Sequence, residues 1–201
     1  LSKGIIMPRL NEEQLVALFH EPRTAYSFTD EPVTDEQLRR IQELTFYGPS
    51  AFNSQPLRIT WIKSPEARER LISHLMDGNK PKAESAPMIA LLSADHGWVE
   101  KADTFNPNSA EFIKGYYGDE NLAKPTADMN AHIQAGYFIT AIRALGLDAG
   151  PMTGADFEGL KKEFLAGTNE QPFLVVNIGH GIPSGYDRSA RFSHEEATRS
   201  V

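Results

Sequence analysis

Hydrophobic and polar residues follow one another along the chain in patterns that predict both helices and strands. Two helices are predicted to start at capping boxes, residues 11–14 (NEEQ) and 34–37 (TDEQ), each flanked by apolar residues that form a hydrophobic staple. The second helix is expected to stop at Gly48-Pro49, because this pair cannot continue a helix. A third helix is expected over residues 64–76, where a serine cap precedes a proline.

Apolar runs mark the predicted strands. Residues 57–63 are rich in β-branched and aromatic side chains, residues 86–94 are apolar except for Ser93, and residues 173–179 form a third strand. Residues 147–152 are short and extended, and Asp156 is a candidate cap of another helix. Strands and helices do not alternate regularly, which is typical of the α+β class.

One long helix is predicted over residues 127–145, with apolar or small residues on nearly all of its sides. A helix with so small a polar face is expected to be buried in the centre of the fold or against a second subunit. His132 on this helix is therefore interpreted as a hydrogen-bonded core residue. The preceding residues 95–125 are polar, aromatic and interrupted by glycine and proline, which predicts the least regular part of the chain.

Neither a repeat nor a low-complexity linker divides the chain, so residues 10–201 are expected to form a single domain. Residues 1–9 are expected to be a leader or a disordered N-terminus. The net charge of −7 argues against nucleic acid as the main partner, because no general positive field attracts phosphates. The chain has no cysteine, no secretory signal and no apolar stretch of membrane-spanning length, which together favour a cytoplasmic protein.

Four loops carry the candidate chemistry, and each has an ordinary structural explanation beside the functional one. Residues 22–26 place a guanidinium next to a hydroxyl, as an anion site does, but could form a solvated turn. Residues 48–56 either bind the edge of a heterocycle or hydrogen-bond to themselves. Asn79 and Lys82 lie three residues apart, which is also the setting of a surface lysine. Residues 150–154 either bring backbone N–H groups near a ligand or simply connect a strand to a helix.

Motifs of several other enzyme classes are missing from the sequence. No histidines have H-x-H or H-E-x-x-H spacing, and neither a G-x-S-x-G elbow nor a phosphate-binding Walker loop occurs. The segment 179–185 (GHGIPSG) follows a predicted strand, as a dinucleotide-binding fingerprint does. Its third glycine is one residue late and Pro183 continues a loop, so it is not interpreted as such a site.

Taken in order, these loops resemble segments of the FMN-dependent nitroreductase family, and the resemblance covers residues 10–197. The family's P-S-S-x-N-x-Q-P-W segment resembles residues 49–57 (PSAFNSQPL), and its Asn-x-x-Lys pair resembles Asn79 and Lys82. Residues 146–154 (GLDAGPMTG) resemble its G-L-D-x-x-P-x-x-G turn. Further matches are residues 22–26, 177–181 and 188–191.

The resemblance implies a nitroreductase-like fold, with a mainly antiparallel sheet flanked by helices, in an intertwined homodimer with FMN at the subunit interface. The phosphate and ribityl chain would be bound by Arg23 and Thr24, with Arg188 and Arg191. Pro49, Ser50 and Asn53 would come from the other subunit. Asn79 and Lys82 would meet the pyrimidine edge of the flavin, and residues 152–154 would pass beside N5. The cofactor-binding residues that it implies are Arg23, Thr24, Tyr26, Pro49, Ser50, Asn53, Gln55, Asn79, Lys82, Pro151, Met152, Thr153, Gly154, Arg188 and Arg191.

The resemblance also implies an FMN-dependent NAD(P)H oxidoreductase with a ping-pong cycle. NADH or NADPH would reduce the flavin and leave before an electron-poor acceptor (a nitroaromatic, a quinone or a small semialdehyde) binds. Because the flavin carries the hydride chemistry, no catalytic side chain and no metal are assigned. The branch that it resembles most contains malonic semialdehyde reductase. A protein that sequesters FMN, or an enzyme that consumes the flavin, would have the same pocket and is the alternative. A structural protein on this scaffold would bind no flavin.

Overall fold

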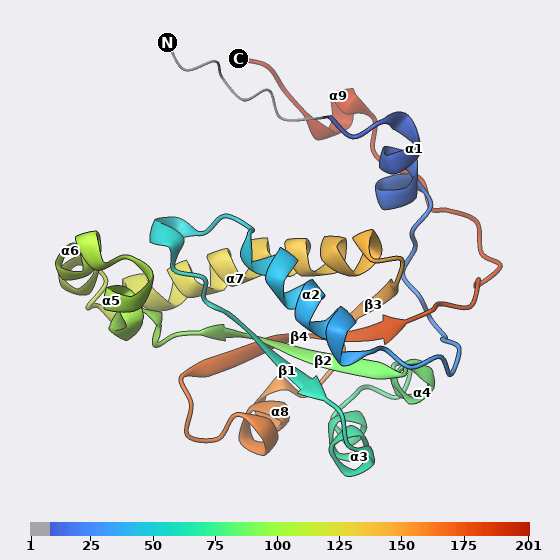
Figure 1. The fold of residues 1–201 in the computed structure, drawn as a ribbon, viewed down its shortest axis with the longest axis horizontal. Coiled ribbons are helices and arrows are strands. Elements are labelled where there is room, and N and C mark those ends of the chain that lie inside the picture. The colour runs from blue at the N-terminus through green and yellow to red at the C-terminus, as the bar shows by residue number, and fades with distance from the viewer. Residues whose placement is uncertain (1–8) are drawn as a thin grey trace.

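The computed structural model describes residues 9–201, and its centre is a four-stranded sheet in the order β1-β2-β4-β3 (Figure 1). The strands are β1 (Leu57–Ile62), β2 (Met88–Asp95), β3 (Asp148–Met152) and β4 (Glu170–Gly179). Every neighbouring pair is antiparallel, which confirms the prediction of a mainly antiparallel sheet. All residues of β2 are buried, since it lies inside the sheet and is covered on both faces, and its residues from Met88 to Leu92 are therefore all apolar.

Helices cover both faces of the sheet (Figure 1). One face carries α2 (Asp35–Phe46) and α7 (Glu120–Ala144), and the other carries α3 (Pro65–Ser73) and α8 (Phe157–Phe164). Successive side chains of a strand point to opposite faces. Leu92 of β2 accordingly belongs to the core cluster of α2 and α7, whereas Leu91 belongs to the cluster of α3 and α8. This arrangement confirms the predicted α+β class.

The helix starts follow their sequence signals. Both predicted capping boxes are formed, and they start α1 (Glu12–Leu15) and α2. A turn of π-helix, η1 (Val16–His20), continues α1. The third predicted helix ends at Ser73 instead of near residue 76, because the following backbone pairs with the chain beyond β3: the Met76 N–H donates to the Gly154 carbonyl at 3.0 Å.

Two predictions about the middle of the chain are wrong. Helix α7 starts at Glu120, where Asp119 caps it, and not at residue 127. Pro125 lies inside the helix without breaking it, and the turn before it is held by the Asp119 side chain, which accepts the Asn121 N–H. The region expected to be irregular contains short helices, namely η3 (Trp98–Lys101), α5 (Ala102–Phe105), η4 (Pro107–Ser109) and α6 (Ala110–Tyr116).

Further observations concern individual predictions. Helix α4 (Lys80–Ser85) is not predicted, although Pro81 in its first turn is a typical start signal. His132 is exposed and is not a core residue, and its ring instead lies 4.2 Å from that of Phe173.

Over residues 9–201, the structure contains no helix of the length and apolarity needed to cross a bilayer. The expected leader at residues 1–9 lies almost entirely outside the described residues.

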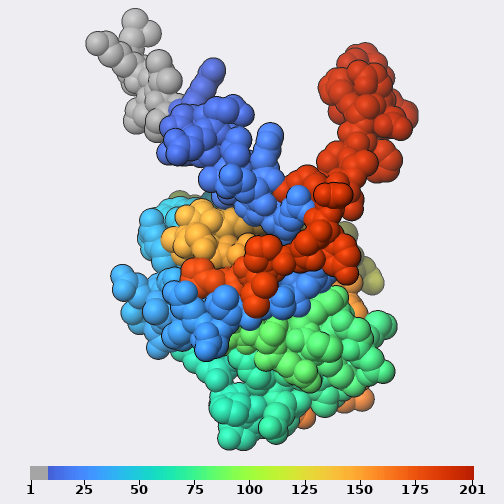
Figure 2. Space-filling model, turned by 90° about the vertical axis from the view of Figure 1, so that its right-hand side faces the viewer, coloured from blue at the N-terminus to red at the C-terminus, as the bar shows by residue number. Residues whose placement is uncertain are grey.

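Both ends of the described chain project from the body. Every residue from 182 to 201, which we call the C-terminal arm, is exposed, including the short helix α9 (His194–Ala197). Figure 2 shows the N-terminal helix in blue and the arm in red as separate projections on the same side of the molecule. The exposed arm includes apolar side chains, among them Phe192 at 83% exposure.

Candidate functional site

The predicted loop at residues 22–26 lies along the outer side of the edge strand β3. The Ala25 N–H donates to the Ala149 carbonyl at 3.1 Å, and Phe28 forms an isolated antiparallel bridge with Gly181. Gly150 makes this approach possible, since a Cβ atom there would lie 2.7 Å from the Ala25 carbonyl oxygen. The glycine therefore serves the packing of the chain's own backbone.

We expect Gly150→Ala to lower the free energy of unfolding by about 1–3 kcal/mol, because the atom that it meets is backbone and cannot rotate away. Urea unfolding checks this value. Gly115→Ala is the matched control, since a Cβ there meets nothing within 4 Å and the residue lies in helix α6, where alanine is favoured. Equal stability of the Gly150 variant and wild type would show that residues 22–26 adapt freely.

A small cavity of about 220 Å³, which we call the lysine cavity, lies beside β3. Its lining residues are Thr24, Ala25, Tyr26, Asn79, Lys82 and residues 150–154. The Lys82 ammonium donates to Asn79 Oδ1 at 3.0 Å and lies 5.1 Å from the centre of the Tyr26 ring. The Asn79 amide in turn donates to the Gly154 carbonyl at 3.1 Å. These contacts orient the ammonium next to the end of β3 and the two residues that follow it, so Lys82 is not an isolated surface lysine.

A larger cavity of about 620 Å³, the arginine cavity, adjoins the lysine cavity, and Thr24 and Tyr26 line both. Among the described residues that line the arginine cavity, four carry a guanidinium group and one, Asp187, carries a carboxylate. The four are Arg23, Arg143, Arg188 and Arg191. An excess of planar, permanently charged donors is suited to a phosphate or carboxylate.

The C-terminal arm forms part of this cavity by docking onto the N-terminal loop. Arg23 Nη1 donates to the Tyr186 carbonyl, and Arg188 Nη2 donates to the carbonyls of His20 and Pro22. Arg191 Nη1 donates to the Ser189 carbonyl at 2.9 Å. The predicted site residues of the first loop and of the arm are thus brought together, although more than 150 residues separate them in sequence.

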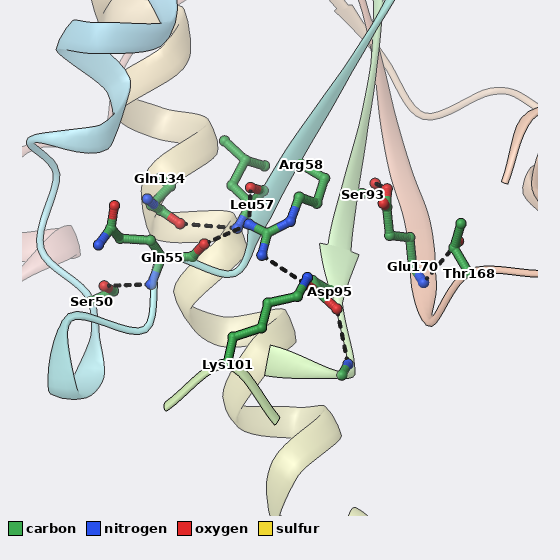
Figure 3. A network of polar contacts seen from close by, with 11 residues as sticks. Ser50, Gln55, Leu57, Arg58, Ser93, Asp95, Lys101, Gln134, Thr168 and Glu170 are labelled. Carbon is green, nitrogen blue, oxygen red and sulfur yellow. Dashed lines mark hydrogen bonds and ion pairs between the residues drawn. The ribbon is translucent and has the colours of Figure 1, made fainter. Parts of the chain in front are cut away.

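The loop at residues 48–56 lies at the other end of the sheet, far from both cavities (Figure 1, cyan). Pro49, Ser50, Asn53 and Gln55 therefore do not join the other predicted site residues within one chain. The loop has a defined shape: Ser50 Oγ accepts the Gln55 N–H at 3.0 Å (Figure 3), and the Ala51 N–H donates to Asn130 Oδ1 at 2.7 Å. Phe52, Asn53 and Gln55 have positive φ angles of 55°, 62° and 43°.

A polar network ties this loop to the sheet (Figure 3). Arg58 Nη1 donates to the carbonyls of Gln55 and Leu57 at 2.8 Å each, and Nη2 donates to Asp95 at 2.7 Å. Lys101 pairs with the same carboxylate at 2.5 Å. The Asp95 side chain is 4% exposed, so its charge is compensated by two cations at the end of β2.

We expect Asp95 to make folding stability depend on pH. Burial raises its pKa, but the hydrogen bond from Lys101 and the charges of Arg58 and Lys101 outweigh burial and hold the pKa below its ordinary value. Because the pKa is lower in the folded chain, this stabilisation is present above the unfolded value of about 3.9 and is lost as pH falls through the folded value.

Asp95→Asn should therefore lower the free energy of unfolding at pH 7 by about 1.5–3 kcal/mol, and the difference from wild type should shrink in acid. Urea unfolding at neutral and acidic pH measures this. Asp103→Asn removes an exposed ion pair with Lys114 and should change stability by less than about 1 kcal/mol. A difference between Asp95→Asn and wild type that stays constant down to the lowest pH would contradict the assignment.

Sequence reasoning did not single out Arg143, Arg58 or Asp95. Arg143 stands in the last turn of the long apolar helix, where a charged residue is itself a signal, but helical periodicity does not show what a helix end faces. No group of three or more histidine, aspartate or glutamate side chains in the described part of the chain could hold a metal ion.

Comparisons with known proteins agree with this architecture. Residues 21–180 match the family model described as the nitroreductase family. A Streptomyces coelicolor protein with the provisional name NADH dehydrogenase/NAD(P)H nitroreductase is 48% identical over 92% of this chain and 94% of its own length.

Solved structures show the same fold. A provisionally named nitroreductase of Bacillus subtilis superposes with a TM-score of 0.84 at 22% identity, covering 95% of this chain and all of that one. A provisionally named nitroreductase of Exiguobacterium sibiricum, solved in complex with FMN, gives a TM-score of 0.83 at 17% identity over 96% of this chain and 98% of its own. With a family model that matches most of its length and a relative of this identity, the chain belongs to the nitroreductase family.

Proposed function

We propose that the protein is an FMN-dependent NAD(P)H oxidoreductase that passes hydride to an electron-poor acceptor. The observation that carries this proposal is the pair of adjoining cavities, one rich in arginine and one holding the oriented Lys82. The names of the relatives support it, since they refer to NAD(P)H nitroreductases. The FMN complex of the Exiguobacterium neighbour supports the choice of cofactor.

The chemistry of the two cavities fits FMN. Four guanidinium groups against one carboxylate suit a phosphate, and Thr24 and Tyr26 line both this cavity and the one that holds Lys82. At Gly154 a Cβ atom would lie 2.6 Å from Asn79 Nδ2, so this glycine keeps the Asn79 amide in the wall of the lysine cavity. A flat heterocycle with hydrogen-bonding edges is the ligand that an amide beside an ammonium would recognise.

When bound, FMN supplies the hydride chemistry, and the protein supplies binding, orientation and charge. We propose that Arg23 and Arg191 hold the phosphate and that Lys82 and Asn79 bind the pyrimidine edge. Residues 150–154 would form the wall beside the ring, with Pro151, Met152, Thr153 and Gly154 in contact with it. No side chain needs to act as a general acid, because water can deliver the proton.

We further propose that the protein is a homodimer. Met129, Ile133 and Tyr137 are 66%, 42% and 44% exposed and lie four residues apart on one face of α7. Such a contiguous apolar stripe is typical of an interface. A second copy on this stripe would bring the loop with Pro49, Ser50, Asn53 and Gln55 from one subunit toward the cavities of the other, which accounts for its distance from them in one chain.

The purified protein tests this function through the visible absorbance of bound flavin. We expect this absorbance to be bleached by NADH or NADPH without air and restored by a quinone, a nitroaromatic or a semialdehyde, which also identifies the acceptor class. Parallel lines in double-reciprocal plots would support a ping-pong cycle. Bound flavin that neither nucleotide reduces would favour sequestration, and a protein that binds no FMN would contradict the proposal.

A further inference from the structure

Arg143 differs from the other three arginines of the arginine cavity in its surroundings. Arg23, Arg188 and Arg191 are exposed, and each donates a hydrogen bond to a carbonyl of the chain itself. Arg143 is half-buried in the last turn of α7, and among the described residues its guanidinium donates no hydrogen bond and pairs with no carboxylate, although its Nε is buried. Among the described residues it is therefore the arginine of this cavity whose guanidinium has no partner in the chain.

An unused buried donor needs an explanation, since leaving such a group without a partner costs about 1–3 kcal/mol. The favourable position of a cation at a helix C-terminus explains why an arginine is tolerated in the last turn, but it satisfies no N–H group. Among residues 9–201, no carboxylate lies within ion-pair distance of Arg143. Because the Arg143 side chain lines the arginine cavity, an anion bound there would pair with its terminal nitrogens and compensate its charge.

We infer that Arg143 is a phosphate ligand of the arginine cavity and fixes the terminal phosphate of the cofactor to the core of the protein. This inference rests on the proposed function for the identity of the ligand. The side chain is carried by a 25-residue helix that packs on the sheet, whereas the other three arginines come from a loop and from the exposed arm. A cation that is already held in place loses less conformational entropy on binding.

Because Arg143 is partly buried, its contribution to the affinity for the phosphate should depend on salt less than the contributions of the exposed arginines. Interactions between exposed charges are screened at moderate ionic strength, and those of partly buried charges are screened much less. The affinity that Arg143 provides should therefore persist at high salt. The affinity that the exposed Arg191 provides should decline under the same conditions.

The test is titration of FMN and of riboflavin, which lacks the phosphate, into the flavin-free dimer of wild type and of Arg143→Ala. We expect FMN to bind about ten- to a hundredfold more weakly to the variant, corresponding to loss of a hydrogen bond to a charged group, and riboflavin to bind within about twofold of wild type. Arg143→Lys should recover only part of the loss, because an ammonium cannot reproduce the planar donor set. Arg39→Ala, at an exposed position of α2, is the matched control and should change neither affinity.

A second measurement separates this inference from the proposed function. Inorganic phosphate should raise the melting temperature of the flavin-free wild type, and Arg143→Ala should clearly reduce the increase. If wild type binds no FMN, the proposed function fails, and the phosphate effect still supports or overturns the role of Arg143. Equal losses for FMN and riboflavin, or an unchanged response to phosphate, would show that Arg143 supports only the fold.

Discussion

Replacing Ile133 with aspartate should convert the protein from a dimer into a monomer and release its flavin. Ile133 stands in the middle of the exposed apolar stripe of α7, between Met129 and Tyr137. A carboxylate there would be buried without a partner in the dimer, and leaving a charge uncompensated costs about 3–5 kcal/mol. The dissociation constant of the dimer should therefore rise more than a hundredfold.

Sedimentation velocity at micromolar protein, recorded at the flavin absorbance as well as in the ultraviolet, measures assembly and cofactor in one experiment. Ala166→Asp is the control, because it adds the same charge at an exposed position next to α8, on the other face of the sheet. The control should remain dimeric and yellow. A monomeric Ile133 variant that keeps its full flavin content would show that one chain makes the whole site.

Replacing Lys82 with methionine should weaken FMN binding at least tenfold and lower the midpoint potential of the bound flavin. An ammonium about 4 Å from a negative charge, at an effective dielectric constant of about 20, contributes about 4 kcal/mol before desolvation is subtracted. The charge favours the reduced cofactor over the oxidised one, since reduction adds electrons near the pyrimidine edge. Each 1.4 kcal/mol of this preference corresponds to about 30 mV in a two-electron couple.

The matched control for this variant is Lys80→Met on the same helix. Lys80 pairs with Asp77 at the surface, and it does not line the lysine cavity. Spectroelectrochemical titration of both variants should show a lower potential for Lys82→Met alone. An unchanged potential and unchanged FMN content in that variant would show that Lys82 acts only as a structural partner of Asn79.

Local elements could be predicted where their signals are contiguous in sequence. The box TDEQ forms because residues three apart satisfy each other's backbone donors, and this requires nothing from the rest of the fold. The start of α7 was not predictable in this way. Pro125 suggests a break in any isolated helix, but here the preceding turn is held by the Asp119 cap and by the packing of Ala123 in the interior.

The site residues were named through a family resemblance, and pattern alone would not have grouped them. The contact between Asn79 and Gly154 joins residues 75 apart in sequence, and only the tertiary fold brings them together. Arg143 and the network of Arg58 with Asp95 were missed for the same reason. A sequence shows that a charged residue occurs on a helix or strand, whereas its neighbours depend on how the elements pack.

The pairing of the first loop with the end of the sheet has a consequence for synthesis on the ribosome. Residues 25–29 bond to Ala149 and His180, so the segment that carries Arg23 has no place to bind until almost the whole chain has emerged. At about 5–20 residues per second, this segment waits many seconds before its partners exist. The cofactor pocket must therefore form after translation of the last strand, and a nascent chain released before β4 would have neither the pocket nor a complete sheet.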